Sequence, residues 1–441
     1  MTGHRASLLE RITSRHALVG VVGLGYVGLP LVRAFHNAGF PTLGFDIDPQ
    51  KILALNAGRD YLKHPEPGLA RKLLDSGRFG ATGDFARLAE PDAILVCVPT
   101  PLAESREPDL SYVEQTVERI ARTLRPGQLV VLESTTYPGT TRDVVLPRLA
   151  RSGLNVGDDF FLAYSPERED PGSPGRTAQH IPKLVGSLDE ASSEVATTLY
   201  AAAVERVVRV RTPEVAEAAK LLENVYRSVN IALVNEMKVV LETLGIDAWE
   251  VIDAAATKPF GFQRFDPGPG MGGHCIPIDP FYLSWKARQV GADARFIELA
   301  GEVNHAMPAR VVAKTIDSLR ARKVDPAKAR VLVLGLAYKK NIDDVRESPS
   351  FEIISLLREH VAHIDYADPH VPSTHPGRRG DLGMTAVELA PGSLASYDAV
   401  VVATDHDAFD WPTIGEHARL IIDARGRMRT LSNVKAPVVP A

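Results

Sequence analysis

The sequence contains only two cysteines, Cys97 and Cys275, among its 441 residues. So few thiols exclude a disulfide framework and a cysteine-rich metal site, and they suit a reducing compartment. Long apolar runs are also missing, because no stretch of about 18 consecutive apolar residues occurs. The N-terminal segment lacks an apolar run followed by a small-residue cleavage site. We therefore expect a cytoplasmic protein with no membrane span and no metal.

An excess of positive charge is absent as well. The chain has 50 lysines and arginines against 55 aspartates and glutamates, which gives a formal net charge of -5. Nucleic acids and anionic membranes are bound through broad basic surfaces, so neither is expected as a partner. A small anionic ligand held by a few local residues remains compatible with this composition.

Residues 214–244 contain neither glycine nor proline, and their apolar residues recur at helical spacing. Thr212 is suited to cap this segment, Pro213 to begin it and Gly245 to end it. A helix of roughly 30 residues is about 45 Å long, which exceeds most single domains. We expect it to connect two domains or to form a subunit interface.

Short β-branched runs alternate with helix-like segments in the first 200 residues, as in a parallel sheet with crossover helices. They cover residues 18–22, 41–48, 93–99, 129–135 and 159–166. Similar runs return after a polar connection near residue 325, at 330–337, 363–369, 398–406 and 420–426. The last residues, 433–441, are expected to form a loose tail.

These patterns predict an α/β protein with two Rossmann-like doubly wound sheet domains joined by a long helix and a helical middle domain. The predicted boundaries are 1–210 for the first sheet domain, 211–322 for the helical domain and 323–441 for the second sheet domain.

A glycine motif, Gly23-x-Gly25-x-x-Gly28, follows the first expected strand and precedes a helix-like segment. Such glycines allow a tight turn and close approach of the backbone to a pyrophosphate, and Tyr26 and Val27 belong to the same loop. Asp46 ends the next expected strand, where a carboxylate binds the adenosine ribose and favours NAD over NADP. The alternative is a glycine turn that binds no ligand.

Three further residues near this motif have two interpretations each. Lys51 either contacts the ribose side of the cofactor or is a solvated helix lysine. Thr100 and Thr135 follow the third and fourth expected strands, where a doubly wound sheet opens its ligand crevice. Their hydroxyls either bind cofactor or substrate or cap the following turns.

Cys275 lies in the irregular segment 268–280, Gly-Pro-Gly-Met-Gly-Gly-His-Cys-Ile-Pro-Ile-Asp-Pro. Its thiol is either a nucleophile with Asp279 close by in sequence or a small buried apolar group. Lys220 and Asn224 are four residues apart and share one face of the long helix. They either stabilise an oxyanion or form an ordinary solvated pair.

Taken together, the motifs GLGYVGLP, FDID, VPTP, EST, YSPER, AKLLEN, GGHCIPIDP and GLAYKKNIDDVRESPS resemble those of the UDP-glucose/UDP-N-acetyl-hexosamine 6-dehydrogenases. The resemblance covers about residues 15 to 430. It implies NAD as cofactor, a UDP-sugar as substrate, a homodimer and a place in polysaccharide biosynthesis. In this family the C6 alcohol of the sugar is oxidised twice, through a thiohemiacetal and a thioester.

The resemblance also implies roles for individual residues. Cys275 would be the nucleophile, and Asp279 would assist proton transfer through a water. Lys220 and Asn224 would stabilise charge on the C6 oxygen, and Thr135 and Glu167 would complete the site. Arg346 would reach the cofactor. The substrate would be bound by these catalytic groups and by Arg168, Arg264, Phe265, Gly268, Gly272 and Lys339, with the loop glycines leaving room for the sugar diphosphate.

Two departures bear on the substrate. Ile278 stands where many UDP-glucose enzymes have lysine, and Pro171 stands where they have a second glutamate. These differences favour UDP-N-acetylglucosamine, with UDP-glucose and UDP-N-acetylmannosamine as alternatives. A non-catalytic binder of NAD or a nucleotide sugar would not need Cys275. A β-hydroxyacid dehydrogenase would not need a second nucleotide-type domain.

Overall fold

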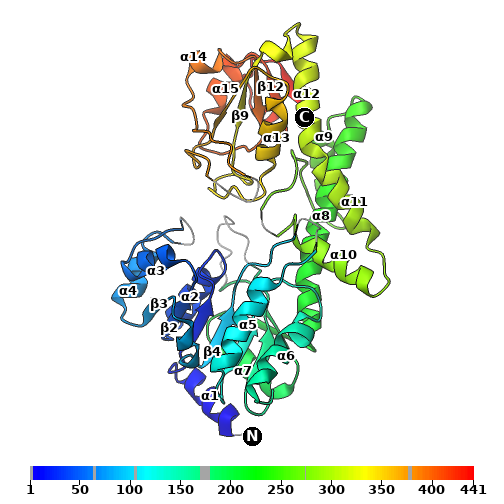
Figure 1. The fold of residues 1–441 in the computed structure, drawn as a ribbon. Helices are drawn as coiled ribbons and strands as arrows, with labels where there is room; N and C mark the ends of the chain where they lie inside the picture. The colour runs from blue at the N-terminus through cyan, green and yellow to red at the C-terminus, as the bar shows by residue number, and fades with distance from the viewer. Residues whose placement is uncertain (1–2, 63–65, 104–106, 169–178, 274, 376–379) are drawn as a thin grey trace. The chain divides into compact units, whose positions relative to one another are not determined.

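The computed structural model describes residues 3–62, 66–103, 107–168, 179–273, 275–375 and 380–441. The chain packs into two compact units, each with its own sheet (Figure 1). Unit 1 comprises Met1–Glu223 and Phe281–Ala292, and unit 2 comprises Asn224–Pro280 and Asp293–Ala441. The division into three domains at residues 210 and 322 stays a prediction. Within the described residues, no helix combines the length and apolar composition that crossing a bilayer requires.

Within the described residues, the sheet of unit 1 has eight strands in the order β3-β2-β1-β4-β5-β6-β7-β8, and of its neighbouring strands only β6 and β7 pair antiparallel. The first six follow the order of doubly wound dinucleotide-binding sheets, which confirms the predicted fold class. The strands are β1 (Val19–Val22), β2 (Thr42–Phe45), β3 (Phe79–Thr82), β4 (Ala93–Val96), β5 (Leu129–Leu132), β6 (Phe161–Tyr164), β7 (Lys183–Ser187) and β8 (Val207–Val210).

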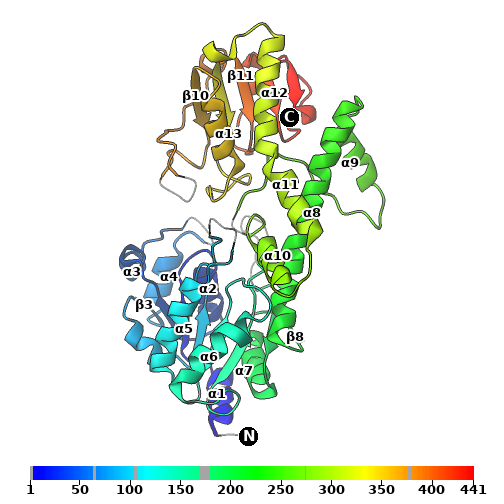
Figure 2. The same cartoon turned by 45° about the vertical axis from the view of Figure 1, so that its right-hand side comes forward.

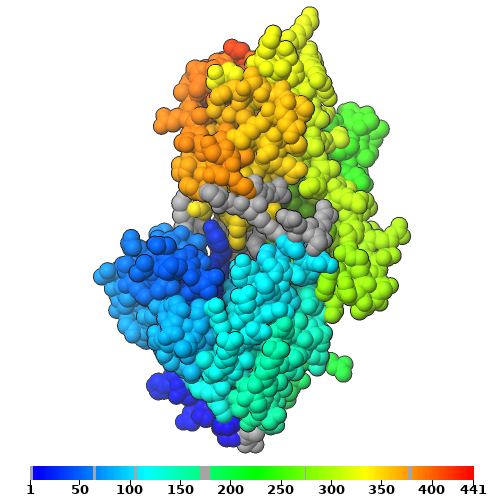
Figure 3. Space-filling view, viewed as in Figure 1, coloured from blue at the N-terminus to red at the C-terminus, as the bar shows by residue number. Residues whose placement is uncertain are grey.

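Helices cover both faces of this sheet because its central strands are apolar at consecutive positions. In β4, Ala93 and Leu95 join the core under α1, α2 and α7, whereas Ile94 and Val96 join the core under α5 and α6. Figure 3 shows the cyan side chains of α5 as a continuous surface. The helices of unit 1 are α1 (Gly3–Thr13), α2 (Gly28–Asn37), α3 (Pro49–Asn56), α4 (Leu69–Asp75), α5 (Ser111–Thr123), α6 (Leu146–Leu149) and α7 (Glu190–Ala201).

The helical part of the chain contains the long helix that the sequence predicts. Helix α8 runs without a break over Pro213–Thr243 (Figure 2), and Gly245 follows it with a φ of +74°. Its first eleven residues belong to unit 1 and the rest to unit 2. The remaining helices of this part are α9 (Ala248–Ala256), α10 (Asp279–Gln289), α11 (Arg295–His305) and α12 (Met307–Ala321).

The sheet of unit 2 has five parallel strands in the order β10-β9-β11-β12-β13. The strands are β9 (Arg330–Leu334), β10 (His363–Ala367), β11 (Ala399–Val402), β12 (Ile421–Asp423) and β13 (Val438–Pro440). Helices α12 and α13 (Pro349–Arg358) contribute to the core on one face, and α14 (Pro391–Leu394) and α15 (Trp411–His417) to the core on the other. The prediction of a loose C-terminal tail is wrong, because β13 pairs with β12 and the Ala441 N–H donates to the Asp423 carbonyl at 3.0 Å.

The second sheet repeats the local plan of the first where β9 ends. Gly335 has a φ of +87°, and a Cβ there would lie 2.5 Å from the Thr404 carbonyl oxygen. Asp368 follows β10, and its Oδ2 accepts hydrogen bonds from the Leu336 and Ala337 N–H groups at 2.6 and 3.0 Å. The ring nitrogen Nε2 of His406 lies 3.1 Å from the same oxygen. The side chains of Asp368 and His406 are both fully covered.

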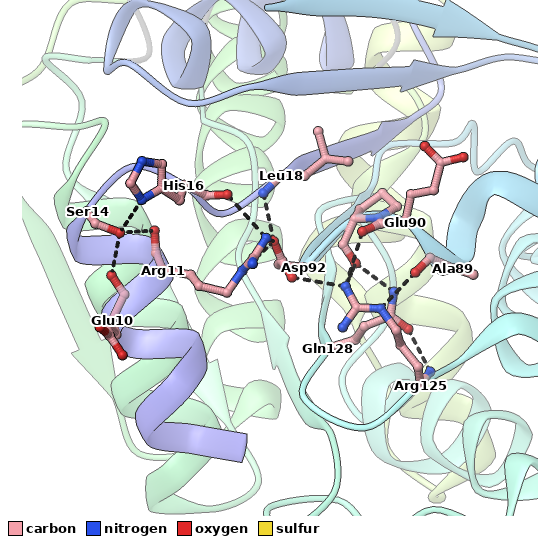
Figure 4. A network of polar contacts seen from close by, with 11 residues as sticks. Glu10, Arg11, Ser14, His16, Leu18, Ala89, Glu90, Asp92, Arg125 and Gln128 are labelled. Atoms are coloured by element: carbon pink, nitrogen blue, oxygen red, sulfur yellow. Dashed lines mark hydrogen bonds and ion pairs between the residues drawn. The ribbon is translucent and has the colours of Figure 1, made fainter. Parts of the chain in front are cut away.

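A polar network joins the N-terminal ends of the central strands of unit 1 (Figure 4). Asp92, directly before β4, accepts a hydrogen bond from the Leu18 N–H at 2.9 Å. Its carboxylate also pairs with Arg11 at 2.6 Å and with Arg125 at 2.9 Å. Arg125 donates as well to the carbonyls of residues 89–91, so one buried carboxylate connects α1, β1, β4 and the start of β5.

Replacing Asp92 with alanine should lower the free energy of unfolding by about 3 kcal/mol, because two guanidinium groups lose their buried partner. Urea unfolding would measure the change. Asp75→Ala is a matched control, since Asp75 pairs with Arg71 at the surface and should contribute less than about 1 kcal/mol. The network lies at the edge of the sheet opposite the glycine motif, so the KM for cofactor should stay unchanged. Equal stability of both variants would contradict this prediction.

Candidate active site

The three glycines of the first motif have different local roles. Gly23 has a φ of +93°, and a Cβ there would lie 2.5 Å from the Cys97 carbonyl oxygen. A Cβ at Gly28 would lie 1.8 Å from the Gly23 carbonyl oxygen, so Gly28 permits α2 to begin against β1. A Cβ at Gly25 would meet no heavy atom of the described residues within 4 Å. Two glycines therefore make the turn, and the third leaves backbone open to a ligand at the N-terminus of α2.

Asp46 is held beside this loop. Its Oδ2 accepts from the Leu24 N–H at 2.8 Å and pairs with Lys51 Nζ at 3.0 Å. Its Oδ1 accepts from the Asp48 N–H at 2.9 Å. Lys51 is thus an ion-pair partner of Asp46 rather than a freely solvated lysine, and its contact with a ribose stays a prediction.

A cavity of about 400 Å³ opens where β1 and β4 end, at the point where the strand order reverses. Gly23, Gly25, Asp46 and Lys51 line it together with Val98, Pro99, Tyr112 and Arg119. In doubly wound sheets this crevice receives the dinucleotide. The open backbone at Gly25, the buried carboxylate and the apolar walls fit the pyrophosphate, ribose and adenine of NAD.

Thr100 and Thr135 are in contact, through the side chain of Thr100 and the backbone of Thr135. The Thr100 hydroxyl donates to the Thr135 carbonyl at 2.9 Å, and the Thr100 side chain is buried. The Tyr282 hydroxyl donates to the Thr100 carbonyl. Thr100 therefore connects the segments after β4 and β5, whereas Thr135 is half-buried and its role in the reaction stays a prediction.

Glu167 and Arg168 follow β6 and are both half-buried. The carboxylate of Glu167 accepts from the Arg168 N–H at 2.6 Å. The Arg168 guanidinium pairs with Glu223 on α8 at 2.7 Å and donates to the Pro182 carbonyl at 2.7 Å. The Arg168 side chain is thus anchored to α8, and the predicted difference at Pro171 lies outside the described residues.

Lys220 and Asn224 are both buried on α8. Sequence reasoning missed Glu217, which lies one turn before Lys220 and is fully buried. Its carboxylate accepts from the N–H groups of Gly139 and Thr141 at 2.6 and 2.9 Å, and from the Thr141 hydroxyl at 2.7 Å. Burial raises the pKa of Glu217 to about 7 against these hydrogen bonds. The spacing 217, 220, 224 on one helix face was a signal that could have revealed it.

Cys275 and Asp279 form one turn at the start of α10. The Asp279 N–H donates to the Cys275 carbonyl at 2.8 Å, so the two side chains are four residues apart in a helical turn. The Asp279 carboxylate is buried and accepts from the Asn224 amide at 2.6 Å. Asn224 thereby holds Asp279 relative to α8. Ile278, between them in sequence, is buried.

The glycines before Cys275 pack against protein rather than leaving open space. A Cβ at Gly272 would lie 2.4 Å from the Tyr338 Cβ, and one at Gly268 would lie 2.8 Å from Arg425 Nη1. The Gly268 N–H donates to Asn235 at 2.9 Å, and the Gly273 N–H donates to the Arg346 carbonyl at 2.9 Å. These glycines let the loop pack closely within unit 2, and their contact with a substrate stays a prediction.

A second cavity, of about 430 Å³, lies within unit 2. Two predicted substrate residues, Arg264 and Lys339, line it, whereas the Phe265 ring packs against Tyr226 at 5.8 Å. Sequence reasoning missed the cations that follow β12, although their alternation in Arg-Gly-Arg-Met-Arg was visible. The charged lining consists of Arg264, Lys339, Lys340, Arg425, Arg427 and Arg429 against Asp266 and Asp405.

This excess of cations is partly offset by ion pairs. Arg264 pairs with Asp253 at 2.5 Å and with Asp266 at 2.8 Å, and Arg429 pairs with Asp253 at 2.8 Å. Arg425 donates to the Ala403 carbonyl at 2.7 Å. Several arginines and lysines around one cavity suit a diphosphate, because guanidinium groups bind phosphate oxygens in pairs.

Arg346, the predicted cofactor residue in unit 2, forms a two-point pair with Asp344, with Nη2 to Oδ2 at 2.7 Å. Its contact with the cofactor stays a prediction.

Three family models match the chain in order. They are the NAD binding domain (residues 17–204), the central domain (214–306) and the UDP binding domain (332–430) of the UDP-glucose/GDP-mannose dehydrogenase family. The cavity with Asp46 lies in the first of these segments. Part of the lining of the cationic cavity, including Lys339 and Arg425, lies in the third.

Curated relatives are similar over nearly the whole chain. A UDP-N-acetyl-D-mannosamine dehydrogenase of Pyrococcus horikoshii is 34% identical over 92% of this chain and 95% of its own. A UDP-N-acetyl-D-glucosamine 6-dehydrogenase of Pseudomonas aeruginosa is 35% identical over 89% and 91%. The solved structure of the UDP-D-ManNAc dehydrogenase of Pyrococcus horikoshii superposes with a TM-score of 0.86, at 32% identity over 96% of this chain and 98% of that one. The chain therefore belongs to the UDP-glucose/GDP-mannose dehydrogenase family and is an NAD-dependent nucleotide-sugar dehydrogenase.

Proposed function

We propose that this chain oxidises the C6 alcohol of UDP-N-acetylglucosamine to the uronic acid in two successive steps through a covalent intermediate on Cys275. The observation that carries this proposal is the helical turn from Cys275 to Asp279, in which a thiol-bearing residue is followed by a buried carboxylate held by Asn224. Bound NAD would accept one hydride from C6 in each oxidation.

In the first oxidation the C6 hydroxyl loses a hydride and a proton and becomes an aldehyde. The buried ammonium of Lys220 would stabilise negative charge on the C6 oxygen, because a cation in a covered site acts more strongly than in water. Asp279 would take the proton through a water. Asn224 would keep Asp279 in position and donate its second amide N–H to the C6 oxygen.

In the second oxidation the Cys275 sulfur would add to the aldehyde carbon and form a thiohemiacetal. Loss of a second hydride from C6 and of the proton on its oxygen, which Asp279 would again take through a water, leaves a thioester. Glu167 would then take a proton from a water that attacks the thioester, and the Cys275 thiol would be released with the carboxylate product. Each turnover consumes two NAD and one water for each acid formed. Thr135 would contact the substrate beside C6, the carbon that is oxidised.

The nucleotide would lie in the cationic cavity of unit 2. Its diphosphate carries two negative charges, and Arg425, Lys339 and Arg264 supply the opposite charge around a space of about 430 Å³. The buried apolar side chain at Ile278 supports an N-acetylated sugar over glucose, because no lysine is present at that position.

The test of this proposal is turnover of UDP-N-acetylglucosamine, UDP-N-acetylmannosamine and UDP-glucose side by side, with NADH counted per acid formed. We expect two NADH per acid and the highest kcat/KM for UDP-N-acetylglucosamine. A tenfold preference for UDP-glucose would contradict the interpretation of Ile278. A preference for UDP-N-acetylmannosamine would contradict the sugar assignment and leave the two-step reaction standing, whereas a ratio of one would contradict the two-step reaction.

We also propose that a second copy of the chain covers the exposed apolar side of α8. Large apolar side chains there are 40–65% exposed at spacings of seven, four, three and four residues, as in the seam between two packed helices. They are Tyr226, Leu233, Met237 and Val240 on α8, and Leu244 in the turn directly after it.

Size-exclusion chromatography coupled to light scattering should give the mass of a dimer for the native protein. Leu233→Glu should give the mass of a monomer, since a charge in the seam loses its solvation. Leu53→Glu, on exposed α3, is the control and should remain dimeric. A native monomer would overturn the proposal.

A further inference from the structure

Three charged side chains meet within unit 1, from three neighbouring strands. Lys183 begins β7, Glu133 directly follows β5, and Glu167 follows β6. The Lys183 ammonium lies 2.6 Å from Glu133 Oε2 and 3.2 Å from Glu167 Oε2. One lysine is therefore shared between two carboxylates.

Burial separates the roles of the two carboxylates. The Glu133 side chain is fully covered, and its two oxygens accept hydrogen bonds from Tyr200 and Lys183. The Glu167 side chain retains 11% of its exposure, and its other oxygen accepts from the Arg168 N–H. Glu167 is thus the carboxylate of the pair that reaches the solvent, whereas Glu133 contacts protein alone.

Among the described residues, the other titratable groups around Glu167 do not compete with Lys183. Burial raises the pKa of the Tyr200 hydroxyl and of the Cys97 thiol well above their ordinary values, so both are neutral. The Arg168 guanidinium is paired with Glu223. Burial lowers the pKa of Lys183, but the two carboxylates outweigh this effect and raise it above its ordinary value. Burial raises the pKa of Glu133, and the ion pair with Lys183 at 2.6 Å opposes that rise and favours the ionised carboxylate.

We propose that Lys183 is a positioning residue for the release of the product: it holds Glu167 ionised and oriented, and Glu133 limits this effect by sharing the same ammonium. The inference rests on the proposed role of Glu167 as the base that activates water. A carboxylate paired with an undivided cation would be a weak base, since its proton affinity falls with the strength of the pair. Sharing the cation keeps Glu167 ionised and still able to accept a proton.

The geometry predicts opposite effects on the pH profile for substitutions of the two buried residues, Lys183 and Glu133. Lys183→Met removes the cation that favours the ionised form of Glu167, so the acid limb of the pH profile should move to higher pH by about one unit. Glu133→Gln removes a competing negative charge and leaves the ammonium to Glu167, so the acid limb should move to lower pH by about half a unit. A merely structural role would lower the rate of both variants without opposite shifts.

The experiment measures acid formation in a single turnover between about pH 4 and pH 9 for the native protein and both variants, because the ordinary pKa of a glutamate, about 4.3, must lie within the range. Mass spectrometry of acid-quenched samples gives the fraction of Cys275 held as thioester. The double variant Lys183→Met/Glu133→Gln buries two neutral side chains in place of the ion pair. It is measured in place of Lys183→Met if that single variant does not fold. Its acid limb should stay on the high-pH side of the native one. Lys72→Met, at an exposed ion pair with Glu66, is the control.

Shifts of the two single variants in the same direction, or no shift in either, would overturn the inference. Glu167→Gln distinguishes that failure from a failure of the proposed function. If Glu167→Gln accumulates the thioester at every pH, Glu167 is the base, and the shifts decide the role of Lys183. If Glu167→Gln releases acid at the native rate, the assigned role of Glu167 is wrong and the inference falls with it.

Discussion

Replacing Cys275 with serine should reduce acid formation by a factor on the order of 10³ or more, while UDP-sugar and NAD still bind. A serine hydroxyl is a far weaker nucleophile toward the aldehyde than a thiol, so the second oxidation loses its intermediate. We expect a single NADH equivalent and bound aldehyde, which hydroxylamine would trap. Isothermal titration with each ligand would show whether binding is retained. Native rates of acid formation would exclude the thioester route.

The second cysteine provides an internal control for this prediction. Burial raises the pKa of the Cys97 thiol, so that thiol is protonated and unreactive at neutral pH. Iodoacetamide should therefore label the native protein once, at Cys275, and should not label the Cys275→Ser variant. Cys97 is half-buried and lines the cavity at the glycine motif, so labelling of Cys97 at the same rate would contradict the raised pKa of its thiol.

Replacing Lys220 with methionine should lower kcat by a factor of about 10² to 10³ and change the KM for UDP-sugar much less. The ammonium would act on charge that develops on the C6 oxygen, so its loss is felt in the transition state rather than in binding. Methionine matches the lysine stem in length, which preserves the packing of a side chain that is 7% exposed.

Two further variants test the same residue. Lys220→Arg keeps the charge but places it differently, and we expect a loss of rate between those of the native protein and Lys220→Met. Lys72→Met on α4 controls for loss of a lysine at the surface and should leave kcat within about twofold of native. A large rise in KM at unchanged kcat would show that Lys220 binds the substrate and does not act on the reaction.

The sequence predicted most reliably what local chemistry determines. Pro213 and Gly245 enclose α8 because neither residue is compatible with the interior of a helix. The glycine motif and Asp46 lie at one cavity because both follow neighbouring parallel strands. Cys275 was found as a thiol in irregular backbone, although the regular turn that joins it to Asp279 was not foreseen.

The missed features depend on residues that are distant in sequence. Lys183 begins a strand whose run of five residues gave little signal, and its partner Glu133 is 50 residues away. The glycines at 268 and 272 looked like space for a ligand, but Tyr338 and Arg425 fill that space. Only the folded chain shows which atoms face a glycine, because the partners come from unrelated segments.

The pairing of Asp368 with His406 has a consequence for the timing of the reaction. The Asp368 side chain is fully covered and lines neither of the cavities described above, whereas Asp46 lines the cavity at the glycine motif, so Asp368 is not offered to a ribose as Asp46 is. In the proposed reaction both NAD molecules must then pass through the cavity at Asp46, one after the other. The sugar, oxidised once, has to stay bound to Cys275 while NADH leaves and a second NAD binds. The covalent bond to sulfur would thus keep the sugar bound during the exchange of cofactor. The residence time of the cofactor would then limit the rate of the second half of each cycle.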